Sequence, residues 1–121
     1  MIVAGFGFRA GAGAASLRAA LDGAGRGLPP VTLIAAPDDK LALLAPLAEE
    51  LGVPLAGLAP DALMAVATPT RSAASLAARG VGSLCEAVAL AAAGPGASLI
   101  ASRFIAPDRM ATCAIARGAF S

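Results

Sequence analysis

Residues 80–87 (GVGSLCEA) place two glycines before a serine, with a glutamate three residues after the serine. Ser83 and Glu86 have the spacing of a capping box, which predicts that a helix begins at Ser83. The first turn of a helix presents unpaired backbone N–H groups and the positive end of the helix dipole. Because the glycines allow a ligand to approach the backbone closely, this stretch predicts a site for a phosphate or a carboxylate.

Two cations and two hydroxyls elsewhere in the chain are candidates for the same ligand. Arg9 follows the first expected strand and can hold a carboxylate through a bidentate fork. Lys40 is the only lysine, and an ammonium in the first turn of a helix is unfavourable unless an anion accompanies it. Thr68 and Thr70 offer hydroxyl groups to a polar ligand. The alternatives are ordinary solvated charges for the cations and turn caps for the threonines.

The acidic residues have simpler explanations than catalysis. Reciprocal capping alone accounts for Ser83 and Glu86, and Asp38 and Asp39 are typical helix caps. The chain has no histidine, which excludes Ser-His-Asp and Cys-His sites and removes the commonest metal ligand. We therefore expect no metal and no cofactor.

Residues 5–10 (GFGFRA) match the pattern G-x-G-x-x-A of dinucleotide-binding turns. Their context argues against that function, because only four residues precede Gly5, too few for a complete strand. Phe6 and Phe8 also have the character of strand residues that continue past the supposed turn. A nucleotide-binding module built on residues 5–13 is kept as an alternative.

The composition indicates one domain, residues 1–121, with a core of Leu, Val, Ile and Ala. The net charge is +1 and no basic face stands out, so nucleic acid is not an expected partner. The longest charge-free run, residues 87–102, is interrupted at residues 94–96 (GPG), so we expect no membrane span. The N-terminus lacks a charged region ahead of its apolar residues, so we expect no secretory signal, and a cytoplasmic protein fits these observations.

The hydrophobic pattern alternates between strands and helices. It predicts a three-layer α/β/α fold with a mostly parallel sheet of about five strands and an antiparallel C-terminal hairpin. Ligands of such folds bind at the carboxyl ends of the strands. The expected strands are 1–8, 31–35, 53–58, 97–102 and 110–116. The first expected helix is 14–24, and the second begins at residues 37–39 and ends at Gly52. A short helix from Asp61, a helical turn or two within 72–78 and a helix from Ser83 follow.

Four segments together resemble the CobE/CbiG C-terminal domain family of cobalamin biosynthesis, over nearly the whole chain. They are residues 5–9 (GFGFR), 39–40 (DK) with 47–54 (LAEELGVP), 68–70 (TPT) and 80–90 (GVGSLCEAVAL). The chain has nothing before Met1, so it resembles the stand-alone CobE-like form. The family often has Pro-Lys at the end of the fourth strand, whereas this chain has Ser102-Arg103, which keeps a cation there.

The resemblance implies a ligand, a corrin-ring intermediate of the precorrin or hydrogenobyrinic acid type, and a carrier or accessory role. Such rings carry acetate and propionate carboxylates around a large apolar ring, and small residues would leave room for it. Other enzymes of the pathway are further candidate partners. The predicted binding residues are Gly7, Arg9, Gly11, Lys40, Thr68, Thr70, Gly82, Ser83 and Glu86.

The family also implies an enzymatic alternative. In its longer members this domain is the C-terminal part of a protein that resembles a cobalt-precorrin-5A hydrolase, which opens a lactone and releases acetaldehyde. Without histidine, the general base would have to be Glu86, Asp38, Asp39 or a bound water.

Overall fold

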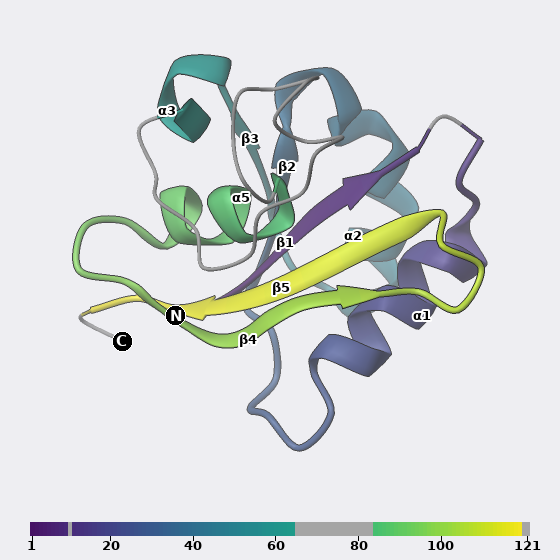
Figure 1. Ribbon diagram of the computed structural model, residues 1–121, viewed down its shortest axis with the longest axis horizontal. Helices are drawn as coiled ribbons and strands as arrows, with labels where there is room; N and C mark the ends of the chain where they lie inside the picture. The colour runs from purple at the N-terminus through teal and green to yellow at the C-terminus, as the bar shows by residue number, and fades with distance from the viewer. Residues whose placement is uncertain (10, 65–83, 120–121) are drawn as a thin grey trace.

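The computed structural model describes residues 1–9, 11–64 and 84–119, which form an α/β fold (Figure 1). None of the helices in these ranges is long and apolar enough to cross a membrane. In chain order the elements are β1 (Ile2–Phe8), α1 (Ala14–Ala24), β2 (Leu33–Pro37), the 3-10 helix η1 (Asp38–Leu44), α2 (Ala45–Leu51), β3 (Leu55–Leu58), α3 (Pro60–Met64), α5 (Leu84–Ala93), β4 (Ser98–Ile105) and β5 (Ala111–Arg117).

The five strands form one sheet in the order β3-β2-β1-β5-β4. The β1–β2 and β2–β3 pairs are parallel, and the β1–β5 and β4–β5 pairs are antiparallel. The predicted C-terminal hairpin is therefore confirmed, but the prediction of a mostly parallel sheet was wrong. The sheet is mixed because β5 returns to pair with β1 along its whole length, from Ile2 opposite Arg117 to Phe8 opposite Ala111.

The two faces of the sheet carry separate hydrophobic cores. Successive strand residues point to opposite faces. Phe6 of β1 packs in one cluster with Leu17 of α1, whereas Val3 packs in the other with Val88 of α5. The helices α1 and α5 therefore pack against opposite faces of the sheet.

The helix expected from residues 37–39 to Gly52 is divided into two pieces. Residues 38–44 form η1, and α2 begins with Pro46 in its first turn. Proline has no N–H to donate to the preceding turn, so an α-helix cannot run through this position unchanged. Gly52 ends α2 in a left-handed conformation, with φ of 69°, as its position in the sequence predicts.

Other element bounds differ from the expected ones by small shifts. Helix α1 occupies the predicted residues 14–24, whereas β4 continues three residues beyond Ser102 to Ile105. The β4–β5 register is irregular between Ala101 and Phe104, so the strand passes a local distortion that the sequence pattern did not reveal. The helical turn expected within residues 72–78 lies outside the described residues.

Candidate functional site

The carboxyl ends of β1 and β2 meet at one edge of the sheet, because the two strands are parallel. β5 begins at the same edge, since Ala111 pairs with Phe8. The helix α5 also begins there, because a Cβ atom at Gly7 would lie 3.5 Å from the Leu84 side chain. We call this region the carboxyl edge and define it as residues 7–9, 11–13, 38–40, 84–86 and 103–112.

Lys40 lies at the carboxyl edge in η1, directly after β2. Its Nζ atom is 5.7 Å from the centre of the Phe8 ring, within the range of a cation–π contact. Phe8 immediately precedes Arg9, so the structure brings these two predicted binding residues to neighbouring strand ends. The aromatic ring orients the ammonium group without neutralising its charge.

Arg9 and Gly11 belong to the loop that follows β1. The Arg9 amide donates a hydrogen bond to the Met110 carbonyl oxygen at 2.9 Å, which joins this loop to the β4–β5 hairpin. Gly11 has φ of 90°, a conformation that favours glycine, so its freedom is needed for the turn itself. The Arg9 side chain is exposed.

Gly5 and Gly7 lie inside β1 rather than in a turn, so residues 5–10 do not form a dinucleotide-binding loop. A Cβ atom at Gly5 would lie 2.4 Å from the backbone nitrogen of Ala89, and one at Gly7 would lie 3.0 Å from Thr112 Oγ1. The glycines therefore allow close approach of neighbouring elements, α5 above all. The binding role of Gly7 stays a prediction.

Glu86 lies in the first turn of α5 and is fully buried, with 0% of its surface exposed. Its Oε2 atom accepts a hydrogen bond from the Arg103 backbone amide at 2.9 Å. The Arg103 amide lies within the irregular part of β4, so the Glu86 side chain supplies the hydrogen-bond acceptor that a neighbouring strand would otherwise provide. Glu86 thus connects α5 to β4, and through β4 it fixes the backbone of Arg103 at the carboxyl edge.

Four predicted binding residues lie outside the described residues: Thr68, Thr70, Gly82 and Ser83. The predicted helix start at Ser83 and its capping box lie outside them as well. These assignments stay predictions.

At the carboxyl edge, three arginines and the acidic residue Asp108 differ in whether their side chains are paired. In the described ranges, Arg9, Arg103 and Arg109 have no acidic partner within salt-bridge distance. Asp108, by contrast, accepts hydrogen bonds from the Ser16 hydroxyl and, at 3.0 Å, from the Met110 amide. These two bonds, that of Ser16 first, lower the pKa of the Asp108 carboxyl. The edge therefore combines a carboxylate that is already hydrogen-bonded with cations that are available to an anion.

Sequence reasoning missed Arg109, which follows the turn predicted at residues 107–108. Nothing in the local pattern places this residue beside Arg9. The placement follows only from the pairing of β5 with β1, which joins Met110 to the loop after β1.

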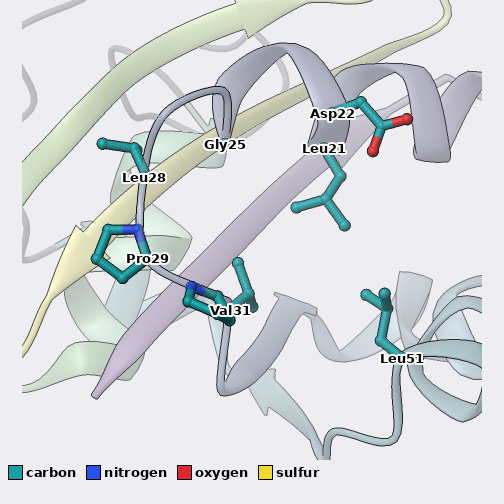
Figure 2. Close-up of a pocket in the computed structure, with 8 residues that line it drawn as sticks. Leu21, Asp22, Gly25, Leu28, Pro29, Val31 and Leu51 are labelled. Atoms are coloured by element: carbon teal, nitrogen blue, oxygen red, sulfur yellow. The ribbon is translucent and has the colours of Figure 1, made fainter.

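A pocket of about 300 Å³ lies elsewhere, beside the C-terminal ends of α1 and α2 and before β2 (Figure 2). Its wall is mainly apolar and includes one carboxylate, Asp22, which is paired with Arg18 at 3.2 Å. None of the predicted binding residues lines it. The residues that line it are Leu21, Asp22, Gly25, Leu28, Pro29, Pro30, Val31 and Leu51.

A family model described as cobalamin synthesis G C-terminus matches residues 2–116. The chain belongs to this family. It is therefore a protein of cobalamin biosynthesis, as the four segments of the sequence predicted. No curated protein sequence matches the chain.

Solved structures of family members have the same fold. CobE, described as a protein from the cobalamin (vitamin B12) biosynthetic pathway, has 32% identity and a TM-score of 0.85, over 97% of this chain and 89% of CobE. The cobalamin biosynthesis protein chiG from Agrobacterium tumefaciens has 36% identity and a TM-score of 0.75, over 98% and 99% of the two chains.

A putative cobalamin biosynthesis protein G homolog from Sulfolobus solfataricus shares the fold alone, at 20% identity and a TM-score of 0.72. This cobalamin synthesis G C-terminus domain matches 36% of that longer chain.

Proposed function

We propose that this protein binds a corrin-ring intermediate of cobalamin biosynthesis at the carboxyl edge, as a carrier or accessory protein. The observation that carries the proposal is the position of Arg9 and Lys40 at adjoining strand ends, with no acidic partner at salt-bridge distance in the described ranges. Ligands of α/β sheets commonly bind where parallel strands end. A family of cobalamin biosynthesis supplies the class of ligand.

The chemistry of the ligand fits the chemistry of this edge. Corrin intermediates have several carboxylates around an apolar ring, and each can accept two hydrogen bonds from one guanidinium. Arg9 offers such a fork, and Lys40 offers a compact ammonium oriented by the Phe8 ring. The first turn of α5 adds the positive end of a helix dipole at the same edge. Gly7, Gly11, Gly82, Ser83, Thr68 and Thr70 complete the proposed binding set.

Glu86 takes part in this proposal as a positioning residue. It is fully buried and accepts the amide of Arg103, so it supports the edge from within the core. A carrier or accessory role requires no general base, and this chain contains no histidine that could act as one.

Spectroscopic titration with hydrogenobyrinic acid tests the proposal, because the visible spectrum of a corrin responds to its surroundings. We expect a saturable spectral change and co-elution of ligand and protein at tens of micromolar. Arg9→Ala and Lys40→Ala should each weaken binding by about 1–3 kcal/mol, the usual contribution of a hydrogen bond to a charged group. Arg26→Ala is the matched control, since Arg26 is an exposed arginine in the loop after α1, outside the carboxyl edge.

The titration has three outcomes that decide against parts of the proposal. Absence of any spectral change or co-elution would refute corrin binding. A change that progresses with time would indicate turnover and favour the enzymatic alternative. Equal weakening by all three substitutions, Arg26→Ala included, would show that the binding site lies elsewhere.

A further inference from the structure

The turn between β4 and β5 holds one residue in an unusual backbone conformation. Arg109 has φ of 61°, and it is the one non-glycine residue with positive φ in the described ranges. The Arg109 amide donates to the Ala106 carbonyl oxygen at 2.8 Å, and the Ala106 amide donates to the Ala111 carbonyl oxygen at 2.9 Å. This is a hairpin turn whose last residue is left-handed, a position at which glycine is preferred.

The left-handed conformation is unfavourable for arginine, because its Cβ atom approaches the neighbouring carbonyl oxygen. Elsewhere the described chain places glycine at such positions: Gly11, Gly27, Gly52, Gly94 and Gly96. A residue retained in a strained conformation directs attention to its side chain, because such strain concentrates at functional sites.

Two contacts join the Arg109 turn to the loop that follows β1, one hydrogen bond joins it to α1, and another lies within the turn. The hydroxyl of Ser16, in the first turn of α1, donates a hydrogen bond to Asp108, and Asp108 accepts a second one from the Met110 amide. The Met110 carbonyl oxygen accepts the Arg9 amide, and a Cβ atom at Gly11 would lie 3.9 Å from Met110 Cε. The residue after Arg109, Met110, is therefore hydrogen-bonded directly to the backbone of Arg9.

The Arg109 side chain is exposed and has no acidic partner at salt-bridge distance in the described ranges. Asp108, the acidic residue that precedes it in the chain, is engaged by Ser16 and Met110. We propose that Arg109 is a further carboxylate-binding residue of the carboxyl edge, which, with Arg9, selects ligands that carry ionised carboxylates on adjoining parts of their rim. This inference rests on the proposed corrin binding at the same edge.

The test compares Arg109→Gly with Arg117→Ala, an exposed arginine at the opposite end of β5. The probes are hydrogenobyrinic acid and its fully methyl-esterified form. We expect Arg109→Gly to weaken binding of the acid about 5–50-fold while leaving the ester unaffected. The same substitution should raise the melting temperature by about 2–5 °C, because glycine removes the backbone strain.

Arg109→Lys separates charge from geometry. This substitution should weaken binding of the acid less than Arg109→Gly does, since lysine keeps the charge but not the planar guanidinium group. Arg117→Ala should bind both probes as the wild type does.

The outcomes distinguish this inference from the proposed function. If the wild type does not bind the acid, the proposed function fails and this inference fails with it. If the wild type binds and Arg109→Gly binds equally well, only this inference is refuted. A lower melting temperature for Arg109→Gly would show that the arginine serves folding, which also contradicts the inference.

Discussion

The carboxyl edge and the α1–α2 side of the molecule use arginine in opposite ways. On the α1–α2 side, Arg18 pairs with Asp22 on its own helix and with Glu50 on α2. Hydrogen bonds to Asp22 and Glu50 raise the pKa of Arg18. At the carboxyl edge, Arg9, Arg103 and Arg109 have no such partners in the described ranges. The Arg18 guanidinium is already paired with carboxylates of this chain, whereas unpaired guanidinium groups are available to a ligand.

The α1–α2 side also contains the pocket described above. The pocket on the α1–α2 side has a mainly apolar wall, and its one carboxylate is already paired with Arg18. None of the residues of the proposed binding set lines this pocket. The distribution of unpaired charge is the more informative property, because the proposed ligand is an anion with several carboxylates.

The largest expected effect comes from Gly5→Ala, compared with Gly23→Ala on the other face of the sheet. A Cβ atom at Gly5 would lie 2.4 Å from backbone atoms of Cys85 and Ala89, so α5 would have to move away from β1. At Gly23 the three atoms nearest to the new Cβ all belong to the Phe104 ring, a side chain that can shift more readily than backbone. We expect Gly5→Ala to lower the free energy of unfolding by about 3 kcal/mol or more, measured by urea denaturation.

Gly23→Ala should be clearly less destabilising, because alanine also favours the helix. Gly13→Ala is a control with no atom within 4 Å of the new Cβ. Equal losses of unfolding free energy in Gly5→Ala and Gly23→Ala would contradict the interpretation that close backbone contact between β1 and α5 positions the carboxyl edge.

The second prediction compares two glutamates, one from each region. Glu86 is fully buried and accepts the Arg103 amide, whereas Glu50 is exposed and contacts Arg18. Glu86→Ala should lower the free energy of unfolding by about 2–4 kcal/mol, because the part-buried Arg103 amide loses its acceptor and a buried side chain is truncated. Glu50→Ala should have little effect, since exposed ion pairs contribute little to stability.

Glu86→Gln tests which property of the glutamate matters. The amide keeps a hydrogen-bond acceptor, so this variant should lose less stability than Glu86→Ala in the same denaturation experiment. A loss for Glu50→Ala as large as that for Glu86→Ala would remove the distinction between the two regions.

The smallest expected effect concerns Asp108, which connects the two regions by accepting the Ser16 hydroxyl of α1. Its pKa is lowered in the folded protein, so its contribution to stability is present above the unfolded pKa of about 4. That contribution is lost as the pH falls through the folded value. NMR titration of the Asp108 carboxyl carbon should give a pKa below the ordinary value in the wild type.

Ser16→Ala provides the control for this titration, because it removes the principal cause of the shift. The Asp108 pKa should then rise toward its ordinary value. An unchanged pKa in Ser16→Ala would show that the hydroxyl does not hold the carboxylate.

The local features of the fold were predictable from the sequence, because nearby residues determine them. The bounds of α1, the end of α2 at Gly52 and the antiparallel pair β4–β5 all follow from periodicity and turn residues. The position of β5 beside β1 was not predictable in this way. It depends on pairing between residues as distant as Ile2 and Arg117, and no local pattern encodes that partner.

The same distinction between local and long-range features separates the site residues that were predicted from those that were missed. Arg9 was identified because it directly follows a strand, and Lys40 because it is the only lysine and was expected in the first turn of a helix. Arg109 was missed because its place at this edge depends on the long-range β1–β5 pair. The distortion of β4 at Arg103 was also missed, since it requires a buried carboxylate from α5 that sequence spacing assigned to a helix cap.

The position of β5 inside the sheet, between β1 and β4, also constrains how the chain can fold. β1 is made first and lies in the middle of the sheet, but one of its two neighbours is the last strand of the described chain. A nascent chain that has not yet emerged to Arg117 therefore exposes one side of β1 and part of the apolar surface on both faces of the sheet. Sheet completion must wait until β5 has been synthesised, and the late pairing of distant segments is the step expected to limit the folding rate.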